Sequence, residues 1–454
     1  MGFATPAFLT VLLPAAWAGC FLLRRWPRVS NVFLALISLA FYAAGEALGT
    51  VLLLGCAAMD YGLGRAMQSK KSKGWLAVGV CAHLLLLGVF KYAGFAIATV
   101  NDVFGTSLSA PALALPIGIS FFTFQGVSYL VDVYRGETSA AHDPVSLTLY
   151  LSFFPQLVAG PIVRWDDFSR QLSDRRITAE NAARGLRRMI IGLSKKVLLA
   201  DGLAAMVDAA FGAALPTVGG AWLGAFAFTM QLYLDFSGYT DMALGMGQAM
   251  GFSLPENFRL PLCAGSLRDF WRRWHMTLTG WFRSYVYLPL GGNRQGQART
   301  MRNILVVFLL TGLWHGAGWT FVLWGLWHGL GMCVDRALPQ AKTSVQRALR
   351  YVGTLLFVIV GFCWFRADSV PDAVRYLGAM LGLTGAQSGG ATLLTMRTVV
   401  VLLTSALVSF GVLRRMPRPT WLRAASYPAC LFLLALCYAA LIASGYHPFL
   451  YFRF

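Results

Sequence analysis

The sequence predicts an all-α membrane protein that crosses the bilayer many times. Of its 454 residues, 57% are hydrophobic and only 13% are charged, whereas a typical soluble protein is about one quarter charged. Apolar runs of roughly 18 residues or more recur along the whole chain, and each is long enough to cross the hydrocarbon core as a helix. The runs are continuous and do not alternate with a period of two, so they favour helices over a β-barrel.

The net charge of +19 does not point to a nucleic-acid partner. The basic residues lie in short loops between apolar runs, for example at Arg24–Arg28 and Lys70–Lys73. This distribution is typical of the positive-inside rule and of contact with anionic lipid. No Lys or Arg precedes Arg24. Residues 1–23 therefore predict a first membrane helix with its N-terminus outside, because a cleaved signal peptide carries its positive charge at the front.

The apolar runs predict roughly ten to twelve membrane segments, together with re-entrant and interfacial helices. The continuous runs lie at residues 1–23, 31–45, 48–67, 75–100, 113–133, 197–214, 219–252, 303–334, 351–365, 395–413 and 427–446, with a shorter apolar run at 370–383. The outward and return passes of the first five runs agree with the positions of the basic loops. No internal repeat or soluble domain interrupts the pattern, so we expect one domain over 1–454.

The run at residues 147–162 differs from the others because it is short and contains Pro155, Gly160 and Pro161. Proline removes a backbone donor and breaks helices. Broken backbone at membrane depth is tolerated where protein or a wet cavity covers it. Two interpretations stay open here: a re-entrant or broken segment that lines a cavity, and a helix followed by an interfacial loop.

Two stretches in the middle of the chain combine charge with apolar sequence. Residues 166–200 are rich in Arg and Lys and predict an interfacial amphipathic helix that leads into a membrane segment. The run 219–252 contains Asp235, Tyr239 and Asp241. Two acids in an apolar run should face protein or water and not lipid. A structural polar network and a binding role are both open for them.

Two regions contain the histidines that point to chemistry. Residues 254–303 are too polar to span and mix Trp, Tyr, Phe and Arg around His275, which fits interfacial helices. The run 303–334 is long enough to cross the bilayer as one helix, yet it contains His315 and His328. An ionisable side chain at membrane depth is costly and indicates a functional site. On one helix the two histidines would point about 140° apart, which disfavours a shared metal ion.

The absence of several known motifs disfavours the protein classes that they mark. The sequence contains no G-x-S-x-G elbow, no Walker A motif, no H-x-x-x-H pair and no C-x-x-C pair. What remains is membrane histidines surrounded by aromatic residues. This combination suits acyl transfer to a hydroxyl, in which a histidine takes the hydroxyl proton while the oxygen attacks a thioester. A histidine that only bonds helices together is the competing interpretation.

Five motifs in family order resemble the membrane-bound O-acyltransferase superfamily, in particular the membrane subunit of bacterial alginate O-acetylation systems. They are FFPQLVAGPIVR at 153–164, LDFSGYTDMALG at 234–245, PENFRLPLCAGSLRDFWRRWHMTLTGWFRSYVYLPLGGNR at 255–294, LTGLWHGAGWTFVLWGLWHG at 310–329 and HPFLYFRF at 447–454. Each motif alone is weak, but together they cover most of residues 110–454.

The resemblance implies a bundle with a funnel on each side and a narrow tunnel between them. It implies that His315 is the catalytic histidine and general base, and that His275 helps to orient or stabilise the reacting groups. His328 is expected to be a packing residue. The residues that we expect to line the substrate tunnel are Asp235, Tyr239, Asp241, Trp271, Trp314 and Trp319.

The resemblance also implies substrates and partners. We expect no bound cofactor or metal, and acetyl-CoA or another acyl thioester as the cytoplasmic co-substrate, drawn by basic stretches such as Lys70–Lys73 and residues 184–196. The acetyl group would pass to a periplasmic acetyltransferase of the serine–histidine hydrolase type or directly to a glycan such as alginate. The expected location is the bacterial inner membrane. A transporter or flippase without chemistry, and a structural scaffold for polysaccharide export, are the alternative functions.

Overall fold

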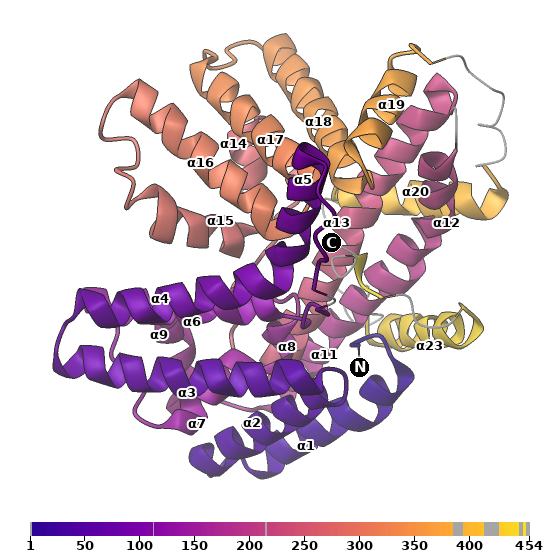
Figure 1. The fold of residues 1–454 in the computed structure, drawn as a ribbon. Coiled ribbons are helices and arrows are strands. Elements are labelled where there is room, and N and C mark those ends of the chain that lie inside the picture. Colours follow the sequence, from indigo (N-terminus) through magenta and orange to yellow (C-terminus); the bar gives the residue numbers. More distant parts are fainter. Residues whose placement is uncertain are drawn as a thin grey trace. The chain divides into compact units, whose positions relative to one another are not determined.

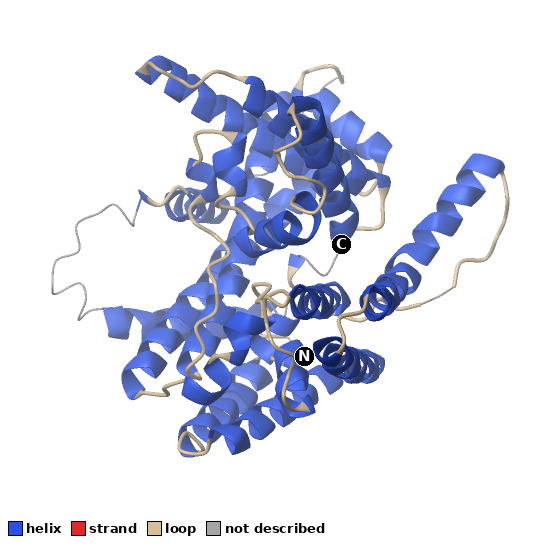
Figure 2. Cartoon of the chain, turned by 90° about the vertical axis from the view of Figure 1, so that its left-hand side faces the viewer, coloured by secondary structure: helices blue, strands red, loops and turns tan. Residues whose placement is uncertain are grey.

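The computed structural model describes residues 2–111, 113–213, 216–384, 394–412, 426–444 and 448–450. Within these ranges the regular secondary structure is helical and no strand occurs (Figure 2), which confirms the all-α prediction. The chain forms two compact units. Unit 1 comprises Met1–Met189 and Thr240–Pro255, and unit 2 comprises Ile190–Tyr239 and Glu256–Phe454. A single catalytic domain over 1–454 stays a prediction.

Unit 1 contains the N-terminal helices of Figure 1. They are η1 Phe8–Leu12, α1 Leu13–Leu22, α2 Pro27–Ala43, α3 Ala47–Ser69, α4 Lys73–Leu87, η2 Gly88–Tyr92, α5 Ala93–Phe104, α6 Ile119–Arg135, α7 Pro144–Ser152, α8 Phe154–Leu157, α9 Trp165–Ser169, α10 Gln171–Asp174 and most of α11 Ala179–Ser194. Helix α6 packs against both α3 and α4. Between them lies a fully buried pair in which His83 Nε2 is 2.9 Å from Asp60 Oδ1.

Unit 2 contains the helices that follow Ile190. They are η3 Lys195–Ala200, α12 Asp201–Gly212, most of α13 Val218–Ala249, η4 Pro261–Cys263, α14 Leu267–Trp271, α15 Met276–Phe282, η5 Arg283–Tyr287, α16 Gln297–His315, α17 Trp319–Ala337, α18 Ser344–Arg366, α19 Val370–Met380, α20 Met396–Ser409 and α23 Ser426–Ser444. The core of this unit is rich in aromatic side chains, among them Phe228, Phe270 and Trp324.

Several described helices match predicted membrane segments. Four are long and apolar enough to cross a bilayer: Ala47–Ser69, Lys73–Phe104, Ser344–Arg366 and Ser426–Ala443. Three shorter apolar helices, Phe8–Leu22, Pro27–Ala43 and Met396–Ser409, match others. The total of ten to twelve segments and the tunnel stay predictions. Residues 214, 413 and 445–446, at the ends of predicted segments, lie outside the described residues, as do 447 and 451–454 of the last motif.

The prediction that one helix runs through residues 303–334 is wrong. Helix α16 ends at His315, and α17 begins at Trp319 and packs back against α16 (Figure 1). The backbone is extended at Gly316 and Gly318, so the helix stops between them. Glycine also allows the close approach of the two helices, since a Cβ at Gly312 would lie 2.3 Å from the carbonyl oxygen of Phe321. The angle of about 140° between His315 and His328 therefore does not apply, because it assumed one helix.

Both interpretations of residues 147–162 place a helix end within the run, and the structure shows one. Asp143 caps the start of α7 by accepting a hydrogen bond from the Ser146 amide at 2.8 Å. The chain leaves the helical conformation at Phe153, just before Pro155, and resumes as the short helix α8. The side chains of this segment are buried within unit 1. That it lines a cavity stays a prediction.

The two regions predicted to be interfacial are only partly on the surface. The amphipathic helix expected in residues 166–200 is present as α11, but Lys195 and Lys196 at its end are buried. In residues 254–303 the expected short helices occur, yet Trp271 and Trp274 lie in the core of unit 2. Their aromatic side chains serve internal packing, which composition alone does not distinguish from an interfacial belt.

Candidate active site

His315 is positioned by the end of a helix. It is the last residue of α16 and it is buried, with 5% of its surface exposed. Its imidazole ring contacts three aromatic rings, those of Trp314 at 5.0 Å, Trp324 at 5.0 Å and Phe365 at 5.3 Å between centroids. Because the helix ends here, the side chain stands beside a glycine turn instead of a further helical turn.

His275 is positioned by an unusual backbone. It directly precedes α15 and has a left-handed conformation with φ of 44°, which non-glycine residues seldom adopt. The conformation is supported on its C-terminal side, where the Met276 amide donates to the Asn257 carbonyl at 3.0 Å. The Arg259 amide likewise donates to the Arg273 carbonyl at 2.9 Å. A local strain of this kind persists where surrounding contacts over-determine it, and it is frequent at functional sites.

The side chain of Asn257 fixes the tautomer of His275. Asn257 Oδ1 lies 3.1 Å from His275 Nδ1 and also accepts a hydrogen bond from the Thr277 amide at 3.2 Å. A backbone amide can only donate, so the atom that faces it is the amide oxygen of Asn257. His275 Nδ1 must therefore carry a hydrogen and donate to the same oxygen. The lone pair of His275 is then on Nε2, which has no hydrogen-bond partner among the residues that the structure describes.

Burial keeps the His275 ring neutral. The residue is fully buried, and it lies outside the helices that are long enough to span the bilayer. Burial penalises the charged form and lowers the pKa of His275 to about 3. At neutral pH the ring is thus an imidazole whose Nε2 can accept a hydrogen bond, and its low basicity suits an orienting role better than proton abstraction.

His275 and His315 are neighbours, and together they form what we term the histidine pair. Their ring centroids are 6.4 Å apart. Phe236 stands edge-on to His275 at 4.8 Å, and Trp314 contacts both rings, at 6.0 Å from His275. The pair is therefore enclosed by aromatic surface, which excludes water and strengthens polar interactions with any group that enters.

His328 lies deeper in the same aromatic core. Its ring is 5.1 Å from Trp324 and 5.2 Å from Trp271, and it is fully buried. Trp324 contacts His315 as well, so one indole separates the two histidines. These surroundings are those of a packing residue, and Trp271, which was expected to line the substrate tunnel, contacts His328.

Asp235 is held by a buried cation. Lys196 Nζ lies 3.0 Å from Asp235 Oδ1 and 2.6 Å from Asp201 Oδ1. The backbone amide of Leu450 donates to Asp235 Oδ2 at 2.9 Å. The ring of Tyr239, one turn further along α13, packs at 4.7 Å from that of Phe449. Asp235 thus anchors the described part of the C-terminal segment, and its charge is compensated, as expected for an acid in an apolar helix.

The other predicted tunnel residues are placed differently. Asp241 belongs to unit 1, where Arg188 Nη2 donates to its Oδ1 at 2.8 Å. Trp319 begins α17 with 52% of its surface exposed. The structure therefore brings Trp314 to the histidine pair and leaves Trp319 outside the buried core of unit 2. The prediction that Asp235 and Asp241 avoid lipid is confirmed, since both face protein partners.

Sequence reasoning missed three residues that support these sites. Asn257 lies in the motif PENFRLP, but the motif gives no sign that its amide faces a histidine 18 residues later. Lys196 and Arg188 were taken as part of a basic surface helix, whereas each pairs with an acid of α13. Asp235 and Asp241 could have indicated that Lys196 and Arg188 are paired, because an acid in an apolar run needs a cation as its partner. No group of three or more His, Cys, Asp or Glu side chains suited to a metal occurs in the described part of the chain.

The sequence model of the membrane-bound O-acyltransferase family (MBOAT) matches residues 119–370, which is more than half of the chain. The chain belongs to the membrane-bound O-acyltransferase family. The histidine pair, α16, α17 and α18 lie inside the matched region. Family membership makes this protein a multi-pass membrane O-acyltransferase. It favours this function over a transporter without chemistry and over a purely structural scaffold.

Relatives support this membership over most of the length. The chain is 38% identical to the probable alginate O-acetylase AlgI of Pseudomonas putida over 490 aligned positions that cover all of both proteins. It is 40% identical to the probable alginate O-acetylase AlgI of Pseudomonas aeruginosa, covering 84% of this chain and 75% of that protein. A peptidoglycan O-acetyltransferase of Helicobacter pylori is 35% identical over 84% of this chain and 80% of its own length. Proteins named as acetylases of two different polymers, alginate and peptidoglycan, are thus similar to this chain.

Proposed function

We propose that the protein moves an acetyl group from a cytoplasmic thioester donor, acetyl-CoA, across the membrane for O-acetylation of an extracytoplasmic polysaccharide such as alginate. The observation that carries the proposal is the buried histidine pair, in which one imidazole has a fixed tautomer and both rings are enclosed by aromatic side chains. The names of the relatives, alginate O-acetylase above all, support the acetyl group and the glycan acceptor.

In the proposed reaction His315 is the general base. It takes the proton of the acceptor hydroxyl while the oxygen attacks the thioester carbonyl, and the departing thiolate then receives a proton. His275 accepts a hydrogen bond through Nε2 from a donor group of the bound substrates and holds them beside His315. The aromatic enclosure limits hydrolysis of the thioester, because it leaves little room for water.

The acetyl group reaches its polymer in one of two ways. It passes to a periplasmic acetyltransferase of the serine–histidine hydrolase type, or it passes directly to the glycan. The aligned relatives are named as acetylases of alginate and of peptidoglycan, so they support an extracytoplasmic glycan acceptor. Asp235, Tyr239 and Trp314 line the route in this proposal, and the bacterial inner membrane with the N-terminus outside is its location.

The experiment is a set of His→Ala variants of the full chain in membrane vesicles with radiolabelled acetyl-CoA. His315→Ala should lower acetyl transfer about 10²–10⁴-fold, which is the usual contribution of a general base. His275→Ala should lower it less, because it removes an orienting group only. His142→Ala is the matched control, since His142 is exposed on a loop of unit 1. Unchanged transfer by a normally inserted His315→Ala variant would refute the assignment of the base.

A further inference from the structure

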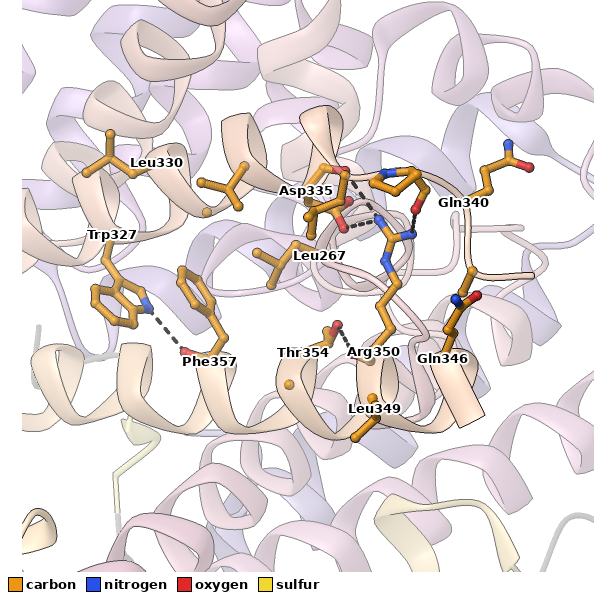
Figure 3. Close-up of a pocket in the computed structure, with 16 residues that line it drawn as sticks. Leu267, Trp327, Leu330, Asp335, Gln340, Gln346, Leu349, Arg350, Thr354 and Phe357 are labelled. Carbon is orange, nitrogen blue, oxygen red and sulfur yellow. Dashed lines mark hydrogen bonds and ion pairs between the residues drawn. The ribbon is translucent and has the colours of Figure 1, made fainter. Parts of the chain in front are cut away.

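A groove on unit 2 is not used by the proposed reaction. It lies between α17 and α18 and has a volume of about 690 Å³. Figure 3 shows Trp327 and Phe357 near one end, and Asp335, Arg350 and Gln340 near the other. Trp327 Nε1 donates to the Phe357 carbonyl at 3.1 Å, which fixes the walls at the first end. We refer to it as the α17–α18 groove.

The middle of the α17–α18 groove is apolar and exposed. Leu330, Val334 and Leu338 of the α17 side and Leu349 of α18 each expose at least half of their surface. Helix α18 is one of the helices long and apolar enough to cross a bilayer. Exposed apolar side chains on such a helix face acyl chains, and a cavity of this size can enclose one chain instead of being filled by side chains.

The far end of the groove carries an excess of positive charge. Asp335 is shared by two guanidinium groups, with Arg350 Nη2 at 2.8 Å from Oδ1 and Arg268 Nε at 3.2 Å from Oδ2. One carboxylate cannot neutralise two arginines. The segment 335–350 adds Arg336, Lys342 and Arg347 and no further acid.

One donor at this end is unused. Arg350 Nη1 donates to the Pro339 carbonyl at 3.0 Å, and Nη2 donates to Asp335. Its Nε–H is buried and has no hydrogen-bond partner among the described residues. A phosphate oxygen is the acceptor that best suits a guanidinium donor in a basic surrounding.

We infer that the α17–α18 groove binds an anionic glycerophospholipid, with one acyl chain along Leu330 and Leu349 and the phosphate at Arg350 and Arg268. The combination of an apolar groove and a basic end distinguishes this ligand from free phosphate, which would gain nothing from the apolar part. Basic pockets between membrane helices are recognised by anionic headgroups. The lipid would hold α17 against α18, and α17 carries Trp324, which contacts His315.

The glycine on the groove wall of α18 offers a test that should not disturb the fold. Gly353 lines the groove, and a Cβ added there meets no atom within 4 Å. The Cβ of Gly353→Leu therefore has room, the rest of the leucine side chain should occupy space of the acyl chain, and leucine favours a helix more than glycine does. Gly55→Leu is the matched control, because Gly55 is an equally open glycine of α3 in unit 1.

A second pair of variants tests the phosphate end. Arg350→Gln removes the guanidinium that lines the groove. Arg347→Gln is its control on the same helix, since Arg347 donates to the Lys342 carbonyl and to Ser344 and does not line the groove. Gly353→Leu leaves Arg350 unchanged. It therefore still tests lipid binding if Arg350→Gln does not fold.

The measurement is native mass spectrometry of the purified full chain with phosphatidylglycerol, phosphatidylethanolamine or inorganic phosphate, together with the melting temperature. Wild type, Gly55→Leu and Arg347→Gln should retain one phosphatidylglycerol and melt at a higher temperature with it. Gly353→Leu should lose at least about tenfold in occupancy, and Arg350→Gln should lose the preference for phosphatidylglycerol over phosphatidylethanolamine. Equal occupancy in Gly353→Leu and wild type would overturn the inference. Equal stabilisation by inorganic phosphate, or no lipid bound to the wild type, would also overturn it, and the latter would assign the groove to a helix of another protein.

Discussion

Two of the fully buried histidines have opposite surroundings, His83 in unit 1 and His275 in unit 2. His83 lies in the middle of α4 and bonds the carboxylate of Asp60 on α3 at 2.9 Å. His275 lies at a strained position before α15 and bonds the amide of Asn257 at 3.1 Å. Both rings are shielded from solvent to the same degree. The difference between them is the charge of the partner.

In our proposal this difference separates a structural histidine, His83, from one that binds substrate, His275. A carboxylate accepts a proton or a hydrogen bond and stabilises an imidazolium, so the ring is committed to its partner. A neutral amide fixes the tautomer without favouring the cation, so the second nitrogen stays available to a substrate. Burial and the membrane setting are therefore insufficient to identify a catalytic histidine. The identity of the group that holds it is the better criterion.

The largest expected effect comes from giving His275 the partner that His83 has. In Asn257→Asp the carboxylate should raise the pKa of His275 above its value of about 3, because it stabilises the protonated ring. A raised pKa means that His275 carries a proton on Nε2 below that pKa and loses its acceptor. Acetyl transfer should then fall at least about tenfold near pH 6 and recover as the pH rises toward about 9.

The pH profile distinguishes this effect from simple damage. Asn257→Ala removes the bond without adding charge, so it should lower transfer by a similar factor at every pH. In the wild type His275 stays neutral across this pH range, so it causes no fall in acetyl transfer toward pH 6. If Asn257→Asp shows the same pH profile as Asn257→Ala, the charge of the partner is irrelevant and the comparison fails.

The sequence predicted the helices and the two histidines of the pair, but not what holds them. His275 and His315 stand out because each is a histidine in a family motif. The contact between Asn257 and His275 depends on a loop that folds back over 18 residues, and loop geometry leaves no periodic signal. The turn at Gly316–Gly318 was missed for a related reason. Hydrophobicity is continuous across it, and only the glycines mark it.

The contact between Asp60 and His83 in unit 1 could not be predicted from the sequence either. Asp60 and His83 lie within two long apolar runs that also contain Arg65 and Lys91, and the contact between them depends on the register of α3 against α4. Asp235 and Asp241 were recognised as acids needing protein partners, yet the partners Lys196 and Arg188 come from the preceding helical region. Tertiary pairing across helices is set by packing, whereas helix formation is set by local periodicity.

Asp60→Ala tests the structural side of the comparison. It leaves the buried ring of His83 without the hydrogen bond that the described residues provide, and we expect a loss of about 3 kcal/mol in the free energy of unfolding. The measurement is the melting of the purified protein in detergent. Acetyl transfer per folded molecule should not change.

The double variant Asp60→Ala/His83→Ala gives the internal control. If the two side chains stabilise the protein as a pair, the double variant should be less destabilised than the sum of the two single variants, by about 1 kcal/mol or more. Strict additivity would show that the two side chains act independently and would remove the basis for calling His83 structural.

Gly126→Ala should have the smallest effect and is the sharpest probe of geometry. Gly126 of α6 faces the pair, and an added Cβ would lie 2.4 Å from His83 Nε2 and 2.5 Å from Asp60 Oδ2. The crowding should cost about 1–3 kcal/mol, offset by about 0.5–1 kcal/mol from replacing glycine in a helix. Gly62→Ala, at an open position of α3, should show only the second, stabilising effect.

The cost of Gly126→Ala in the free energy of unfolding should depend on whether the side chains that the added methyl group contacts are present. In Asp60→Ala/His83→Ala both contacting side chains are absent, so the added methyl group has room and its effect should approach that of Gly62→Ala. Transfer per folded molecule should match the wild type in every one of these variants. If Gly126→Ala instead lowers acetyl transfer as strongly as Asn257→Asp does, His83 takes part in the reaction, and the charge of the partner is the wrong criterion for a catalytic histidine in this protein.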